Sequence, residues 1–161
     1  ADHWTQDLDS GGGRIVGEAC HFIDLLRFLA GASITDFTVS AAAAGDKAMQ
    51  SSDIATVTLK FGDGSIGTIN YFANGHRGFP KERVEVFSSG RVLQLDNFRR
   101  LKGWGWPNFR SRQTWRQNKG QAECVAAFLA SISEGNNAPI PLDEIIEVGR
   151  VSIEAQDLAK V

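Results

Sequence analysis

The stretch Ser10–Gly31, SGGGRIVGEACHFIDLLRFLAG, decides how the first part of the chain folds. Its three consecutive glycines, Gly11–Gly13, can take backbone angles closed to other residues, and they let another chain or a ligand come close to the main chain. An apolar stripe follows at i, i+3, i+4 and i+7, formed by Phe22, Leu25, Leu26 and Leu29. Gly31 stands where a C-terminal cap would fall, so the pattern predicts a helix over about 16–30.

Three candidate groups for proton transfer lie on this helix. At about 100° per residue, Glu18 falls in the apolar stripe, His21 on its shoulder and Asp24 further round. A carboxylate one turn from an imidazole can fix the tautomer of that imidazole, and histidine is the side chain most readily tuned for proton transfer near neutral pH. Structural alternatives stay open: a first-turn acid favoured by the helix dipole, a hydrogen-bonded boundary histidine, and an exposed ion pair of Asp24 with Arg27.

Metal and nucleophile chemistry find little support. Glu18-x-x-His21 is half of a carboxylate-bridged di-metal motif, but the sequence has no second copy. It also has no HExxH and no CxxC pair, so no metal site is expected. Cys20 points to a different side of the helix from His21, so the two would not form a nucleophile–base pair.

The segment GGGRIVGEACHFIDLLRFLAG resembles the opening of the C-terminal domain in the glucose-fructose oxidoreductase, inositol dehydrogenase and rhizopine-catabolism (Gfo/Idh/MocA) family. The family pattern GGG-x-L-x-D-x-G-x-H-x-x-D is matched at Gly11, Gly12, Gly13, His21 and Asp24, with Ile15 at the Leu position. Gly17 stands where the family has an acid and Ala19 where it has glycine, while an acid follows one place later as Glu18. The form GEACHFIDLL is similar to a subgroup fused behind a zinc-type alcohol dehydrogenase module.

The resemblance implies a two-domain enzyme. In this family an N-terminal Rossmann domain holds NAD or NADP and supplies a lysine from a Glu-Lys-Pro motif, and the C-terminal α+β domain supplies the histidine and the substrate wall. The sequence has no Glu-Lys-Pro and begins at Ala1. Its one GxGxxG spacing, Gly62–Gly67, falls in the turn of an expected hairpin and not between a strand and a helix, where a dinucleotide-binding motif would stand. It is therefore expected to be the second half only, with residues 1–161 forming one substrate-binding and oligomerisation domain and the cofactor bound mainly by the missing domain.

Composition sets broad limits. The chain has 161 residues, of which 42% are hydrophobic and 22% charged, and a net charge of −2, as in an ordinary globular domain. So small a net charge gives no sign of a nucleic-acid partner. The two cysteines, Cys20 and Cys124, fall in expected helices and favour a reducing cytoplasm. There is no run of about 18 apolar residues and no signal-peptide pattern, so no membrane partner is expected.

The remaining patterns predict an α+β fold with a predominantly antiparallel, open sheet and helices packed on one face. Strands are expected over 34–44, 53–61, 65–73, 83–87 and 91–96, with a loop over 45–52. Two further helices are expected, one with a stripe of Val125, Phe128, Leu129 and Ile132, the other with a stripe from Ile145 to Leu158. The apolar residues Ile66, Phe72, Leu93 and Leu95 leave open whether the other sheet face forms a homo-oligomer interface.

Two polar stretches are candidates for ligand contact. The loop at 74–83 holds Asn74, His76 and Lys81, which can bind an anionic group or form a solvated connection. Because the resembled family places substrate contacts in this region, these three join Gly12 and Gly13 as candidate substrate-binding residues. The stretch 99–119 interleaves basic residues with aromatic ones and is interpreted first as a long loop covering the core, next as a nucleotide-sugar contact, and last as a nucleic-acid site.

Together these observations predict the catalytic C-terminal domain of an NAD(P)-dependent oxidoreductase acting on a sugar, cyclitol or nucleotide-sugar hydroxyl. His21 would take the hydroxyl proton, and Asp24 or Glu18 would orient it. Gly12 and Gly13 would let substrate or cofactor approach the backbone. The alternative is a non-catalytic module for sheet-mediated oligomerisation or ligand binding.

Overall fold

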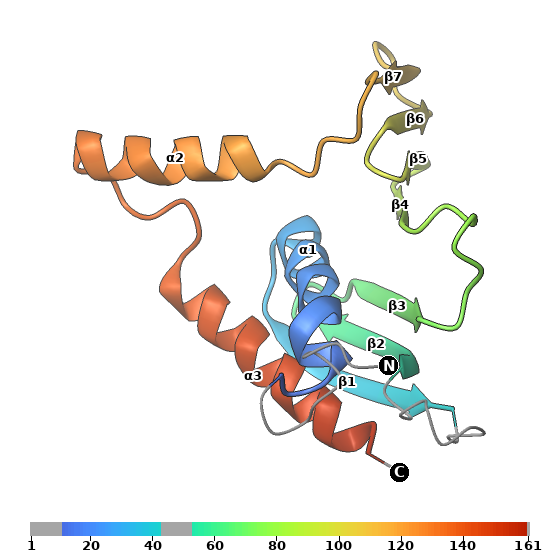
Figure 1. Cartoon of the computed structure of the whole chain (residues 1–161). Helices are drawn as coiled ribbons and strands as arrows, with labels where there is room; N and C mark the ends of the chain where they lie inside the picture. Colours follow the sequence, from blue (N-terminus) through green and yellow to red (C-terminus); the bar gives the residue numbers. More distant parts are fainter. Residues whose placement is uncertain (1–10, 43–52, 161) are drawn as a thin grey trace. The chain divides into compact units, whose positions relative to one another are not determined.

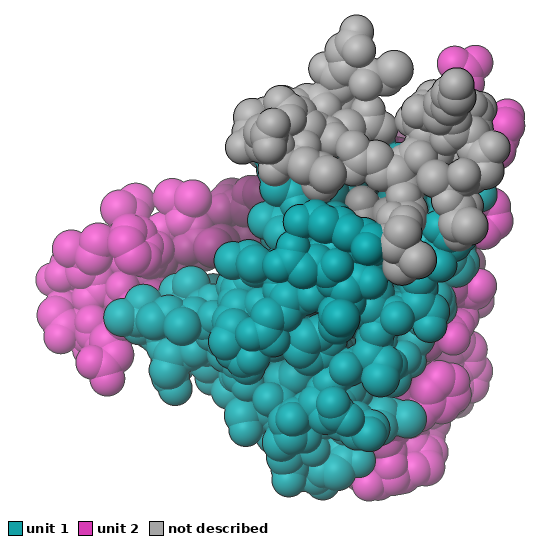
Figure 2. All heavy atoms as spheres, turned by 90° about the horizontal axis from the view of Figure 1, so that it is seen from below, with its two compact units in different colours: residues 1–74, 140–161 teal, residues 75–139 magenta. Residues whose placement is uncertain are grey.

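The computed structural model describes residues 11–42 and 53–160. The entry segment expected at 1–9 and the loop expected at 45–52 lie outside the described residues. The chain forms two compact units, one of residues 1–74 with 140–161 and one of residues 75–139 (Figure 2). Each unit is described by itself below.

The expected first helix is present, but its first turn is wound differently. Residues Ile15–Ala19 form a π-helical turn, η2, and Cys20–Ala30 continue as the α-helix α1. Gly31 ends the helix in the left-handed conformation at φ 65°, as the capping pattern predicted. The fully buried residue of α1 is Ile23, whereas Leu29 of the predicted stripe is exposed, so the stripe is rotated from the one expected.

Three antiparallel strands carry the core of the first unit. The sheet has the order β1–β2–β3, formed by Ile34–Ala41, Ile54–Phe61 and Ile66–Phe72. In β2 the alternation works as predicted, because Val57, Leu59 and Phe61 are buried and the residues between them face the other side. On that other side Ile66 and Phe72 are exposed.

A helix from the far end of the chain closes this core. The helix α3, Leu142–Leu158, packs with α1 against the same sheet face (Figure 1). Its side chains Val148, Val151 and Ala155 are buried, as the periodicity predicted, while the ends of the predicted stripe, Ile145 and Leu158, are exposed. The first unit is thus built from two segments of the chain.

The second unit contains an antiparallel sheet of order β4–β5–β6–β7. Its strands are Arg83–Ser88, Arg91–Asp96, Arg100–Trp104 and Ser111–Gln113. The hairpin of β4 and β5 was predicted. The stretch 99–119, expected as a long loop, instead holds β6 and β7, which pair with Lys102 opposite Ser111. The expected antiparallel α+β fold is confirmed, with its strands in two sheets.

The helix α2, Gln121–Glu134, also belongs to the second unit. Gly135 caps it in the left-handed conformation at φ 68°, as predicted. Its apolar stripe was expected to be packing, yet its members are all more than half exposed: Val125, Phe128, Leu129 and Ile132. In the described ranges, no helix combines the length and the apolar character that crossing a bilayer requires.

Candidate functional site

The glycine run leads directly into the π-helical turn. Gly13 has φ +91°, a conformation in which side chains are strained, and a Cβ built there would lie 2.5 Å from Gln156 Oε1. The same oxygen accepts a hydrogen bond from the Ile15 amide at 3.0 Å. Because Gly13 has no side chain, Gln156 of α3 can reach the Ile15 amide at the start of η2. This contact fixes where the helix begins.

A polar network lies beside this turn, and Glu18 is its centre. Tyr71 Oη donates a hydrogen bond to Glu18 Oε2 at 2.6 Å, and Arg14 Nη1 lies 3.3 Å from Glu18 Oε1. Arg14 Nε lies 2.8 Å from Oδ1 of Asp53, a residue that is almost completely buried. The network ties the glycine run to β2 and β3, and the Glu18 carboxylate is held by two donors.

Tyr71 is the most perturbed group in this network. Burial, as the largest cause, and the hydrogen bond to the Glu18 carboxylate together raise the pKa of the Tyr71 hydroxyl to about 12, although the nearby Arg14 opposes the shift. Tyr71 therefore stays a proton donor through the neutral range. In that state its hydroxyl donates the hydrogen bond that the Glu18 carboxylate accepts.

The two other residues predicted on this helix, His21 and Asp24, lie in α1 one and two turns after Glu18. His21 is exposed to solvent and Asp24 is half-buried. Across the described ranges, no hydrogen bond joins His21 to either carboxylate, and the side chain is exposed to solvent. The orienting roles of Glu18 and Asp24 stay predictions.

The alternative pairing of Asp24 with Arg27 is wrong, because α3 covers that side of α1. Arg27 Nε lies 2.8 Å from Glu147 Oε2, and Arg27 Nη2 lies 3.5 Å from Glu144 Oε1. Glu147 also accepts a hydrogen bond from the Ile34 amide at 2.5 Å. Arg27 thus joins α1 to α3, and Asp24 is left available on the helix that carries His21.

The candidate loop at 74–83 is exposed along almost its whole length. Asn74 ends the first unit, whereas His76 and Lys81 lie in the second. His76 Nδ1 accepts a hydrogen bond from the Gly78 amide at 3.1 Å, which shapes a local turn. The substrate-binding roles of Asn74, His76 and Lys81 stay predictions, as do those of Gly12 and Gly13.

Arg14, Asp53, Tyr71 and Gln156 are residues of the site that the sequence analysis did not select. One signal could have found Tyr71, because the alternation of its strand places it on the same face as buried Ile69. Another could have found Gln156, which lies one turn after the buried Ser152. Among the described residues, no cluster of three or more His, Cys, Asp or Glu could hold a metal ion.

The Glu18–Tyr71 contact can be tested by titration, because Tyr71 is the only tyrosine of the chain. The tyrosinate absorbance of the native chain is expected to rise with a midpoint near pH 12. In Glu18→Gln the midpoint is expected to fall but to stay above the ordinary value of about 10, since the burial remains. Because the pKa of Tyr71 is higher in the folded chain than in the unfolded chain, Tyr71 contributes its full stabilisation of the folded state below about pH 10. This contribution to the free energy of unfolding is lost as the pH rises to about 12.

The urea-unfolded chain is the reference for this titration and should show the ordinary midpoint of about 10. Asp63→Asn is a matched control, because Asp63 is an exposed turn carboxylate hydrogen-bonded to Ser65. An equal native midpoint for wild type and Glu18→Gln would contradict the contact.

Comparison with known proteins places this geometry in a family. The model of the GFO/IDH/MocA C-terminal domain matches residues 1–94, which include the glycine run, α1 and the whole first sheet. The chain belongs to the Gfo/Idh/MocA family. Among curated proteins no relative matches the chain. Fusion to a zinc-type alcohol dehydrogenase module finds no support in these comparisons.

Several solved structures share the family fold. UDP-N-acetylglucosamine 3-dehydrogenase from Acidithiobacillus ferrooxidans has a TM-score of 0.74 at 17% identity, over 89% of this chain and 46% of that chain. Aldose-aldose oxidoreductase from Caulobacter crescentus, complexed with glycerol, has a TM-score of 0.74 at 16% identity, over 98% and 49%. An Agrobacterium radiobacter oxidoreductase in complex with NAD+, L-tartaric acid and magnesium has a TM-score of 0.69 at 16% identity, over 88% and 45%. The chain spans about half the length of these structures.

Proposed function

We propose that this Gfo/Idh/MocA domain is the substrate-binding and catalytic part of an NAD(P)-dependent oxidoreductase that acts on a hydroxyl of a sugar, cyclitol or nucleotide sugar. The observation that carries the proposal is the position of His21. It is an exposed imidazole in the family motif, on a helix whose start is fixed by Gly13 and whose far side is fixed by Arg27. Such a rigid support is what a proton-transferring group needs.

Within the described residues, the chain offers no fold for the dinucleotide. Both sheets are antiparallel, and no parallel strand–helix–strand unit presents a helix N-terminus to a pyrophosphate. The cofactor would therefore be held mainly by an N-terminal Rossmann domain of the parent protein. When bound, the nicotinamide supplies the hydride acceptor.

The chain's own contribution is the proton. Oxidation of an alcohol to a carbonyl removes a hydride from carbon and a proton from oxygen, and the neutral imidazole of His21 can accept that proton. Asp24, half-buried on the same helix, would hold the imidazolium that forms. Solved structures of similar fold include enzymes whose names specify a UDP-sugar or an aldose, which supports a sugar-like substrate.

The test is an assay of the full-length protein with NAD+ and with NADP+ against a panel of sugars, cyclitols and nucleotide sugars. Nicotinamide fluorescence reports the reduced cofactor. We expect the full-length protein to reduce NAD+ or NADP+ with at least one of these substrate classes, and the 161-residue chain alone to reduce neither cofactor. The non-catalytic alternative is favoured if the full-length protein is folded and binds the dinucleotide but reduces it with none of these substrate classes. That alternative is tested directly by measuring the mass of the assembly in solution.

A further inference from the structure

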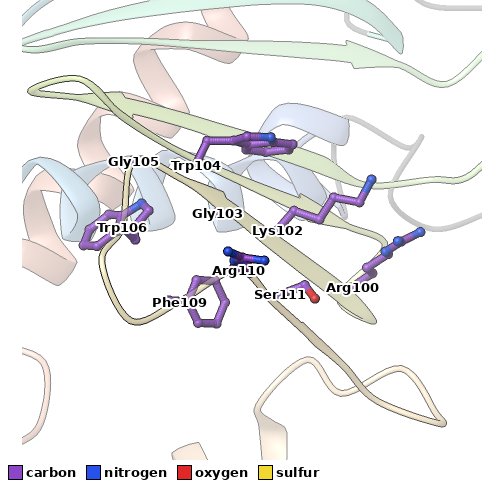
Figure 3. A pocket seen from close by; sticks show the side chains of 9 residues that line it. All are labelled: Arg100, Lys102, Gly103, Trp104, Gly105, Trp106, Phe109, Arg110 and Ser111. Carbon is purple, nitrogen blue, oxygen red and sulfur yellow. The ribbon is translucent and has the colours of Figure 1, made fainter.

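An open cavity of about 540 Å³ lies in the second unit, where β6, β7 and the loop between them meet (Figure 3). Its volume is within the range of about 300 to 1,000 Å³ that small-molecule sites occupy. The side chains that give it chemical character are Arg100, Lys102, Arg110, Trp104, Trp106 and Phe109. No candidate residue of the proposed reaction belongs to this set.

The cations of the cavity differ from other cations of the same unit in their ion pairing. In the part of the chain that the structure describes, Arg100, Lys102 and Arg110 take part in no ion pair. Other cations of the same unit do: Arg83 pairs with Asp96, and Lys119 with Glu82. Three like charges around one cavity repel each other, and an anion bound between them would remove that repulsion.

The strand geometry brings two of these cations together. Side chains alternate along β6, so Arg100, Lys102 and Trp104 share one face of the strand. Lys102 lies directly opposite Ser111 of β7, which adds a hydroxyl donor to that face. Two cations, a hydroxyl and an indole therefore line one side of the hairpin.

The aromatic part is already ordered without a ligand. Trp106 Nε1 donates a hydrogen bond to the Val92 carbonyl at 3.3 Å, and the Arg91 guanidinium lies 4.9 Å from the centre of a Trp106 ring. A Cβ at Gly103 would lie 2.7 Å from the Phe109 ring, so only glycine lets this ring lie against the strand. Trp104 is about half exposed and presents its ring to solvent. Trp106 and Phe109 thus pack on the Gly103 side of β6, whereas Trp104, on the side of Lys102, is the indole open to a planar ligand.

We propose that this cavity binds a nucleoside diphosphate. Two linked phosphates match the cations, and a base matches the half-exposed indole of Trp104, which shares a strand face with Arg100 and Lys102. A nucleic-acid strand fits less well, because a net charge of −2 gives the chain as a whole no attraction for a long polyanion. A compact ligand responds mainly to charges within about 10 Å, where the cations dominate. The link from this site to a nucleotide-sugar substrate rests on the proposed function.

The experiment is calorimetric titration of the purified chain with UDP and with ADP, because the base is not specified by the cavity. Arg110→Gln is expected to weaken binding about tenfold or more, since it removes one charge-assisted contact to phosphate. Arg112→Gln is the matched control, because Arg112 is an exposed arginine of β7 that does not line the cavity. Both variants change exposed side chains, and circular dichroism confirms that each is folded.

Uridine and pyrophosphate test the two halves of the ligand, and each is expected to bind more weakly than UDP. Tighter binding of UDP-N-acetylglucosamine and UDP than of NADH assigns the site to substrate, and the reverse order overturns that link. Absence of UDP and ADP binding in the millimolar range, equal losses in both arginine variants, or much tighter binding of an oligothymidine would overturn the site itself. Failure of the proposed function is seen separately, as absence of turnover by a full-length protein that still binds UDP.

Discussion

His21→Ala in the full-length protein is expected to lower kcat by about a hundredfold or more, which is the typical contribution of a positioned acid–base group. The fold should not suffer, because the His21 side chain is exposed. The measurement is steady-state turnover with the substrate class found above, together with its pH profile. The variant should lose the limb of the profile that reports an imidazole.

Glu154→Gln is a control for general damage, because Glu154 is an exposed carboxylate of α3 whose partner is Arg150. It should leave turnover unchanged. If His21→Ala stayed within about threefold of wild type, the proton would have to be taken by another group. Asp24→Asn separates a positioning role from a chemical one, since a positioning residue should lower kcat less than His21→Ala does, so that part of the turnover remains.

Gly13→Ala is expected to destabilise the chain by about 3 kcal/mol or more. A side chain at φ +91° is strained by roughly 1 to 3 kcal/mol, and the new methyl group would also displace the buried Gln156 amide, at the cost of an overpacked core. Displacing it would break the bond from the Ile15 amide. Urea unfolding monitored by circular dichroism gives the change in the free energy of unfolding.

Gly31→Ala isolates the strain, because Gly31 has φ +65° but nothing within 4 Å of an added Cβ. Its expected cost is about 1 kcal/mol. The double variant Gly13→Ala with Gln156→Ala should lose less stability than the sum of the losses in the two single variants, since the shortened side chain at position 156 no longer clashes with the added methyl group. Equal losses in Gly13→Ala and Gly31→Ala would show that Gln156 moves aside freely.

Local patterns in the sequence predicted the local structure well. The capped helix ending at Gly31, the alternation in β2 and the hairpin of β4 and β5 depend on neighbours in the chain, so periodicity and turn residues suffice to find them. The β6–β7 hairpin was missed for a local reason too. Gly103 and Lys102 weaken the strand pattern, and a run of cations and tryptophans more often indicates a loop.

The candidate site was predictable only in part, because its partners are distant in sequence. The helical spacing pointed to Glu18, but nothing near it in the sequence shows that Tyr71 holds its carboxylate. In the same way Arg27 has an acid three residues away, yet it pairs with Glu147, which is 120 residues further along. Which of two acids pairs with an arginine depends on how the helices pack, and that is decided by the tertiary fold.

The division of the first unit into two segments has a consequence for its biosynthesis. The sheet of β1–β3 is complete once residue 72 has been made, but its apolar face is closed by Val148 and Val151 of α3. At about 5 to 20 residues per second, a ribosome takes several seconds to make the intervening chain. During this interval the sheet face is covered by α1 but not by α3, and the second unit, which is continuous in sequence, can fold first. Chaperone binding to nascent chains should therefore peak at lengths before α3 emerges.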